Sequence, residues 1–165
     1  MDPELPSSAT DPHVLEFLAL WGLPGASYVD YQDVGEGYQP NFCHVSAMHK
    51  ASISGGRRVH GWSLLKYEDV ILGDFHSVWE TPDGNLIDVT PPKVGLRTLF
   101  VRDPTLFIER RGEFQMLYHN RTNVAAAPRL WLGDPIADDR FAMPNQNPFL
   151  VAYCLSLGLA DTIMV

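Results

Sequence analysis

Residues 74–90 read DFHSVWETPDGNLIDVT, which is typical of two β-strands joined by a tight turn. In the central Pro-Asp-Gly, proline fixes φ at the first turn position, aspartate suits the second, and glycine takes the left-handed third. These are the requirements of a three-residue loop, a type I turn closed by a glycine bulge. Because the loop sets the register, we expect Thr81 to face Asn85 and Trp79 to face Ile87.

This register sorts the hairpin side chains onto two faces of a sheet. The face expected to lie on the core is mostly apolar and consists of Phe75, Ser77, Trp79, Ile87 and Val89. The other face carries His76, and Asp88 lies diagonally across from it within side-chain reach. A two-residue loop would put His76 and Asp88 on opposite faces. Asp74 competes for the imidazole from the same strand face, but the cross-strand diagonal favours Asp88.

Outside the hairpin, the order of helices and then strands predicts an α+β fold with an antiparallel sheet. Asp11-Pro12 and Asn147-Pro148 are helix-start signals, a capping side chain followed by proline. We expect helices at 12–21, from 43 to about 54 and from 148 to about 157, and strands at about 59–66, 70–80, 85–90, 98–102 and 106–110. Residues 25–40 and 120–146 are expected to be mostly irregular loop.

The size and charge of the chain limit the classes of protein to which it can belong. With 165 residues, we expect 1–165 to form a single domain whose first ten residues are flexible. Hydrophobic residues make up 45%, which is too many for a disordered chain. The net charge of −8 repels phosphate backbones and gives no attraction to an anionic membrane. We therefore expect neither nucleic acid nor membranes as partners.

The N-terminus has neither the basic nor the apolar region of a secretory signal, and no apolar run is long enough to span a membrane. These features predict a soluble protein, cytoplasmic or exported without a cleaved signal. The two cysteines, Cys43 and Cys154, do not make a disulfide framework. Cys154 falls in the last apolar helix and is expected in the core. The oligomeric state stays open.

Cys43 lies at the start of the second predicted helix. Asn41 can cap this helix, which puts Cys43 in the first turn, where the helix dipole and unpaired N–H groups favour a thiolate. The same N–H groups can bind an oxyanion on a substrate. A carboxylate beside an imidazole fixes its tautomer and stabilises the imidazolium. A thiolate facing the His76–Asp88 pair is the arrangement of a thiol acyl-transfer enzyme.

The order of these residues resembles the papain-like fold, including its transglutaminase-like and deamidase branches, and looks like one bacterial group of that fold. The resemblance covers residues 39–92, about a third of the chain. The motifs that carry it are Asn41-Phe42-Cys43-His44, Gly55-Gly56, Gly61-Trp62, Phe75-His76-Ser77-Val78-Trp79, Asp83-Gly84 and Asp88-Val89-Thr90-Pro91. It implies that Cys43 is the nucleophile, His76 the general base and acid, and Asp88 the orienting carboxylate.

Enzymes of this fold often place a polar side chain a few residues before the nucleophile as an oxyanion donor. The resemblance thus makes Gln39 and Asn41 candidates for that role, although neither has the spacing of papain. The Cys-Gly-Ser-Cys-Trp signature of papain proteases is absent, and Cys43 and His76 are much closer in sequence than theirs. These departures point to the compact branches of the fold.

The function that follows is a cysteine-dependent hydrolase or acyl transferase that needs no cofactor. It would act on a peptide or protein amide through a Cys43 thioester, as a peptidase, an amidase or a protein-glutamine deamidase. The sequence does not choose among these activities. Specificity is expected to lie in the loops at 25–40 and 120–146.

Two other functions remain open. A catalytically dead domain of the same fold could bind a partner, and its sign would be a buried Cys43 or a blocked cleft. A metal-binding protein is the second, with five possible ligands: Cys43, His44, His49, His60 and His76. The absence of His-x-x-x-His and Cys-x-x-Cys spacing counts against a metal.

Overall fold

The computed structural model describes residues 2–124, 140–160, 162 and 164. The elements of this part of the chain are α1 (Pro12–Trp21), β1 (Ser27–Asp30), α2 (Cys43–Ser54), β2 (Arg57–Tyr67), β3 (Val70–Glu80), β4 (Leu86–Ile87), β5 (Arg97–Arg102), β6 (Glu109–Arg111), β7 (Phe114–Tyr118), β8 (Arg121–Thr122), β9 (Arg140–Pro144) and α4 (Pro148–Ser156). The helices and the antiparallel strand pairs confirm the predicted α+β class.

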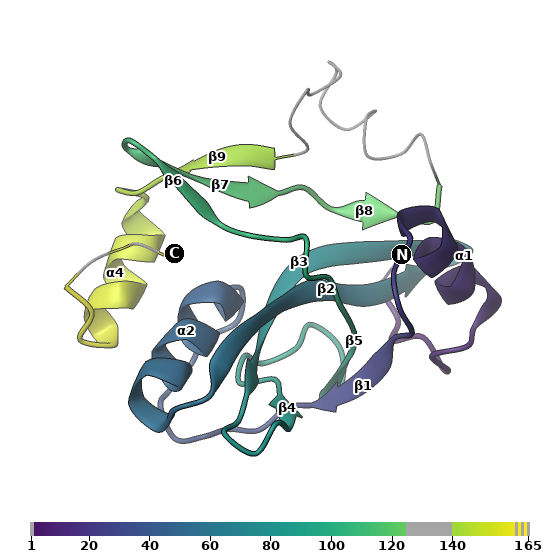
Figure 1. Ribbon diagram of the computed structural model, residues 1–165, viewed down its shortest axis with the longest axis horizontal. Coiled ribbons are helices and arrows are strands. Elements are labelled where there is room, and N and C mark those ends of the chain that lie inside the picture. Colours follow the sequence, from purple (N-terminus) through teal and green to yellow (C-terminus); the bar gives the residue numbers. More distant parts are fainter. Residues whose placement is uncertain (1, 125–139, 161, 163, 165) are drawn as a thin grey trace.

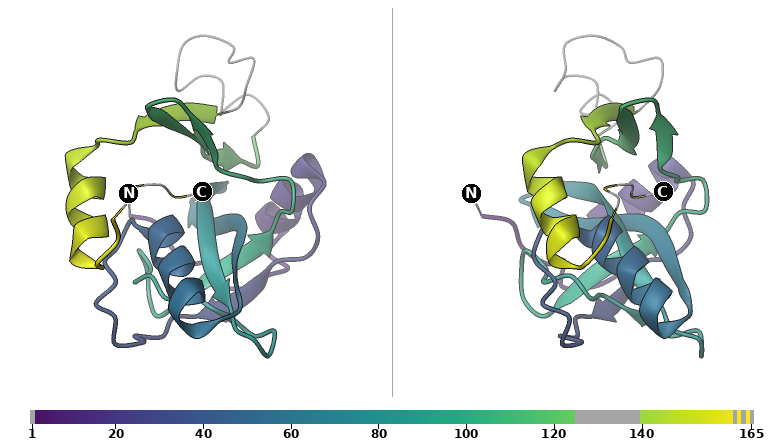
Figure 2. Two further views of the ribbon diagram at one scale, coloured as in Figure 1. Left: turned by 60° about the vertical axis from the view of Figure 1, so that its left-hand side comes forward. Right: turned by 90° about the vertical axis from the view of Figure 1, so that its left-hand side faces the viewer.

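The described strands form a large and a small antiparallel sheet (Figure 1). The large sheet runs in the order β1-β5-β2-β3-β4, and β8 pairs with the start of β3. The small sheet runs in the order β6-β7-β9. Figure 2 shows α4 beside α2, with the small sheet across the top of both. Helix α2 packs on β2 and β3, the two longest strands.

The large sheet curls, so that the end of β1 lies against Asp88, the residue that follows β4. The Asp88 N–H donates to the Asp30 carbonyl at 3.0 Å, and the Gln32 N–H donates to the Asp88 carbonyl at 3.0 Å. Tyr31 and Asp88 form a parallel bridge at the same place. The closure creates a concave inner face, where residues of four strands contact one another: Val29, Val59, Val78 and Phe100.

The hairpin has the register that its turn chemistry predicts. Trp79 pairs with Ile87, and the Thr81 N–H donates to the Asn85 carbonyl at 2.8 Å. Gly84 has a φ of 86°, a left-handed conformation that glycine adopts without strain. The three-residue loop is therefore confirmed. The second strand is shorter than expected, because regular pairing ends at Ile87 and the chain turns toward β1 instead.

The predicted helix boundaries hold. The side chain of Asp11 caps α1 by accepting from the His13 N–H, and Gly22 closes that helix in the left-handed conformation. The side chain of Asn147 caps α4 by accepting from the N–H groups of the second and third helical residues. Both helices thus begin where a cap followed by proline predicts.

Several strands differ from the expectation. Residues 25–40 contain β1, which pairs with β5 along its whole length, so a long-range partner supports a strand that local composition does not predict. The last expected strand, at 106–110, lies at 109–111 as β6 and pairs with β7, which was not expected. Residues 120–146 contain β8 and β9, while 125–139 lie outside the described residues.

The segment before α1, which we expected to be flexible, pairs with the large sheet. Glu4 and Lys66 exchange two backbone hydrogen bonds, of 2.9 and 2.8 Å. The Tyr28 hydroxyl donates to the carbonyl of Pro6. Main-chain pairing of this kind orders a terminal segment even where its composition is rich in proline and serine.

The convex outer face of the large sheet carries the main core. The buried residues that pack there include Val14, Phe17, Val45, Trp62, Leu64, Phe75, Trp79, Leu117, Leu150 and Tyr153. Helices α1, α2 and α4 and the small sheet all contribute to this cluster. The hairpin face of Phe75 and Trp79 therefore lies on the core, as predicted. The His76 face is partly shielded by the closed sheet, and His76 itself is half-buried.

Gly61 allows the concave face to pack tightly. It pairs with His76, so both lie on the same face of the sheet. A Cβ at Gly61 would lie 2.1 Å from the Val101 carbonyl oxygen and 2.4 Å from the Phe100 ring. Contacts this short with backbone cannot be relieved by moving a side chain.

We expect Gly61→Ala to lower the free energy of unfolding by about 1–3 kcal/mol, the usual cost of overpacking a core. Urea denaturation followed by tryptophan fluorescence measures this change. The matched control is Gly25→Ala, because a Cβ at Gly25 meets no atom within 4 Å. Equal denaturation midpoints for the two variants would contradict the packing at Gly61.

Candidate active site

Cys43 is the first residue of α2, and Phe42 is the cap residue. The first helical bond runs from the Ser46 N–H to the Phe42 carbonyl at 2.9 Å. The expectation that Asn41 caps this helix is wrong. The helix starts at Cys43, so the cap position belongs to Phe42, and Asn41 lies one residue before it. Asn41 has a φ of 70°, a left-handed conformation that is not that of a cap residue. Among the described side chains none caps α2, so its first amides are left for another acceptor.

The predicted His–Asp pair is present. His76 Nε2–H donates to Asp88 Oδ2 at 2.8 Å. The Thr98 hydroxyl donates to the same oxygen at 2.7 Å, and the Thr90 N–H donates to the other oxygen at 3.0 Å. The Asp88 carboxylate is fully buried, and a buried charge requires partners of this kind. Asp88 is therefore a rigid anchor for the His76 ring.

Asp74, the competing carboxylate, is bound elsewhere. Lys93 Nζ donates to Asp74 Oδ2 at 2.7 Å. Asp88 reaches His76 because the sheet closes, which fixes the Asp88 backbone against Asp30. The structure thus selects Asp88 as the partner of His76.

A gap along the edge of β3 lets Cys43 contact His76. Helix α2 packs on the convex face through Val45, whereas His76 lies on the concave face. The strand β8 pairs with residues 72–73 and β4 pairs with residues 79–80, and no described strand pairs with this edge between them. The first turn of α2 lies at this gap, where Cys43 and His76 line one pocket. Because Nε2 of His76 binds Asp88, Nδ1 is the nitrogen that faces the thiol.

Charges at the site shift three pKa values together. Burial alone would raise the pKa of the Cys43 thiol, but the charges of His44 and His76 and their hydrogen bonds to it lower the pKa well below its ordinary value. Burial would lower the pKa of His76, but Asp88 and Cys43 raise it well above its ordinary value. Burial would raise the pKa of Asp88, but His76 holds it lower than usual. All three shifts favour the same charge arrangement, in which a Cys43 thiolate and a His76 imidazolium stabilise each other.

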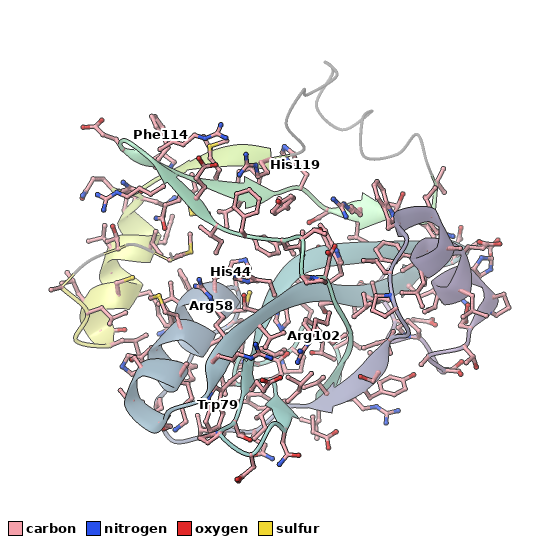
Figure 3. All side chains as sticks on the ribbon, in the orientation of Figure 1. His44, Arg58, Trp79, Arg102, Phe114 and His119 are labelled. Carbon is pink, nitrogen blue, oxygen red and sulfur yellow. The ribbon has the colours of Figure 1, made fainter. Side chains whose placement is uncertain are left out.

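A second imidazole, His44, lies beside the thiol. The sequence analysis gave His44 a possible chemical role only as a metal ligand. Its Nδ1 lies 2.6 Å from Ser77 Oγ, and the same oxygen lies 2.8 Å from Nδ1 of His60. Figure 3 shows His44 close to Arg58, whose Nη1–H donates to the His44 carbonyl at 3.1 Å. One sequence signal pointed here: Ser77 is a hydroxyl on the face predicted to be apolar, and a buried hydroxyl needs a partner.

The thiol opens onto a pocket of about 380 Å³. Of the two oxyanion candidates, Asn41 lines this pocket. Gln39 is exposed and is not among the described residues that line it. The amides of the first turn of α2, which no described side chain caps, lie next to Cys43 in the chain.

The pocket walls differ in part from the loops expected to carry specificity. The segment after Val89, which was not expected to carry specificity, lines the pocket with Thr90, Pro91, Pro92, Lys93 and Val94. Asn120, Phe141 and Met143 come from the expected 120–146 segment, and its residues 125–139 lie outside the described ones. No residue described in the 25–40 segment lines the pocket.

The remaining candidates have other environments. Cys154 is buried in the core with 1% exposure, as predicted. His49 Nδ1 lies 2.7 Å from the Tyr38 hydroxyl, away from the pocket. Within the described part of the chain, no group of three or more His, Cys, Asp or Glu residues is arranged to hold a metal ion.

Comparisons of the chain with models of protein families, with curated proteins and with solved structures found no match. None of the helices in the described residues is long and apolar enough to cross a membrane.

We expect Asp88→Asn to lower the pKa of His76 by about one to three units, because the substitution removes the opposite charge in contact with the imidazolium. The ring resonances of His76 in an NMR titration measure this pKa. Asp74→Asn is the matched control, since it makes the same change two residues before His76 on a carboxylate bound to Lys93. An equal effect of both variants would contradict the assignment of Asp88.

Proposed function

We propose that this protein is a cysteine-dependent amide hydrolase or acyl transferase of papain-like topology that acts through a thioester on Cys43. The observation that carries the proposal is the 2.8 Å bond between His76 and buried Asp88, beside a cysteine at a helix start whose pKa is lowered. The chain order supports the topology, because a helix with the nucleophile precedes the antiparallel strands that position the imidazole and then the carboxylate.

In the first half of the reaction, the Cys43 thiolate attacks the carbonyl carbon of the amide and forms a C–S bond. The electron pair of the C=O bond moves to oxygen, and this oxyanion accepts from the amides at the start of α2. The His76 imidazolium then gives its Nδ1 proton to the amide nitrogen. The C–N bond breaks, the amine leaves, and an acyl thioester remains on Cys43.

In the second half, neutral His76 takes a proton from the acyl acceptor. If water is the acceptor, its oxygen forms a bond to the carbonyl carbon, the C–S bond breaks, and the product is a carboxylic acid. If an amine is the acceptor, the product is a new amide. A peptide substrate therefore yields a cleaved chain, and a glutamine side chain yields ammonia.

One observation favours a second function, a binding module of the same fold. Cys43 is only 8% exposed, and a buried cysteine is most often a packing residue. A packing cysteine would have a thiol pKa that burial does not lower, and it would react slowly. The reactivity of the thiol therefore distinguishes the two functions.

We expect iodoacetamide to label one cysteine rapidly at about pH 6, where an ordinary thiol is almost entirely protonated. Labelling should slow by at least tenfold in His76→Ala, because the thiolate loses its cationic partner. Intact mass measures both rates, and Cys154, with 1% exposure, is an internal control that should stay unlabelled. Slow labelling with an ordinary pH profile, unchanged in His76→Ala, would rule out the catalytic function.

The activity itself is then identified by its product. Glutamine-containing peptides are incubated with the protein and assayed for ammonia, for peptide cleavage and for incorporation of a labelled amine. Cys43→Ser is the control, because it keeps the size and hydrogen bonding of the side chain and removes the thiolate. Activity retained in Cys43→Ser would assign the reaction to another site.

A further inference from the structure

Three polar side chains form a hydrogen-bonded chain behind Cys43, on the opposite face of β3 from His76. His44 Nδ1, Ser77 Oγ and His60 Nδ1 are linked by contacts of 2.6 and 2.8 Å. His44 comes from α2, Ser77 from β3 and His60 from β2. The chain therefore ties the first turn of the nucleophile helix to both central strands.

The packing around this chain holds the rings in place. Ser77 is fully buried, whereas His44 and His60 are half-buried. The Phe75 ring lies against both imidazoles, with ring centroids 4.2 Å from His44 and 5.4 Å from His60, and Arg58 donates to the His44 carbonyl. A fully buried hydroxyl requires a hydrogen-bond partner, and Ser77 has both imidazoles within reach.

The ring nitrogens of His44 have different partners. Its Nδ1 is bound to Ser77, so Nε2 is the nitrogen that is left to face the thiol. Ser77 also binds Nδ1 of His60, and burial with the charges of Arg58 and His44 lowers the pKa of His60 to about 3. His60 is therefore a neutral partner of the Ser77 hydroxyl at physiological pH.

We propose that His44 is a second catalytic imidazole, which donates a hydrogen bond to the Cys43 sulphur and is held in position by Ser77 and His60. This inference rests on the proposed thiol function. Cys43 contacts both His44 and His76, and all three line the same pocket. Ser77 and His60 are positioning residues, because they act only through His44.

Two imidazoles allow a division of roles that one imidazole does not. When the thioester is hydrolysed, His76 takes a proton from water, and the hydroxyl bonds to the carbonyl carbon. The C–S bond breaks and its electron pair stays on sulphur. His44 Nε2–H stabilises that leaving thiolate at the moment when His76 is occupied with the proton of water. The reaction then needs no reprotonation of Cys43.

Other charges near the thiol have different positions and partners. Arg58 and Lys93 each interact with Cys43 through space, and Lys93 is paired with Asp74 at 2.7 Å. Asp88 is bound to His76 and reaches the sulphur only through that ring. Substitution of His44 therefore removes one hydrogen-bond donor to the thiolate and leaves these other charges in place.

The test is the pH profile of iodoacetamide alkylation of Cys43 in His44→Asn, Ser77→Ala and wild type. We expect His44→Asn to slow labelling at about pH 6 by about tenfold, the effect of a one-unit rise in thiol pKa. The limiting rate above about pH 9 should be unchanged, because the thiol is then fully ionised in both proteins. Ser77→Ala should give a smaller loss with the same limiting rate.

The matched control is His49→Asn, the same substitution on the same helix at a residue bound to Tyr38. It should label at the wild-type rate. Wild-type labelling of His44→Asn at pH 6, with slow labelling of His76→Ala, would overturn the role of His44 and leave the proposed function standing. Fast labelling of both variants would overturn both proposals.

A second measurement on the wild-type protein covers the case in which a variant does not fold. Long-range ¹H–¹⁵N NMR spectra of the histidine rings report which nitrogen carries a proton. We expect His44 to carry a proton on Nε2, the nitrogen that donates to the Cys43 sulphur. An unprotonated Nε2 on His44 would leave no donor to the sulphur and would overturn the proposal.

Discussion

The buried carboxylate of Asp88 is the constraint on which the rest of this structure depends. A charge with no contact to water must be hydrogen bonded, and the partners of Asp88 come from separate parts of the chain. His76 lies on β3 and Thr98 lies on β5, while the Asp88 backbone is bound to Asp30 at the end of β1. The hydrogen bonds of the Asp88 carboxylate therefore form only when the large sheet closes.

Charged and polar groups cross the sheet in a line through the gap in the edge of β3. Asp88 and His76 lie on the concave side, Cys43 lies at the gap, and His44 and Ser77 lie on the convex side. Electrostatic attraction is stronger among partly buried groups than in water, so Asp88, His76 and Cys43 shift one another's pKa values. The dipole of α2 adds to the stabilisation of the thiolate at its first residue.

Two pairs of consecutive residues supply four of the five groups in this line. His76 and Ser77 are neighbours on β3 and therefore point to opposite faces of the sheet. Cys43 and His44 are neighbours on α2, and they contact His76 and Ser77 respectively. Gly61 opposite His76 leaves the space that the Phe100 ring fills, so the concave side stays packed around the imidazole.

The sequence by itself determined the features that depend on neighbouring residues: the three-residue loop that sets the hairpin register, the caps Asp11 and Asn147, and the shared face of His76 and Asp88. These could be predicted because turn and cap chemistry act over a few residues. Only the tertiary structure decided the existence of β1, the choice of Asp88 over Asp74, and the link from His44 to Ser77. Each of these depends on a partner that is distant in the chain and is brought into contact by sheet closure or helix packing. Local propensity depends on neighbouring residues alone and therefore cannot predict that partner.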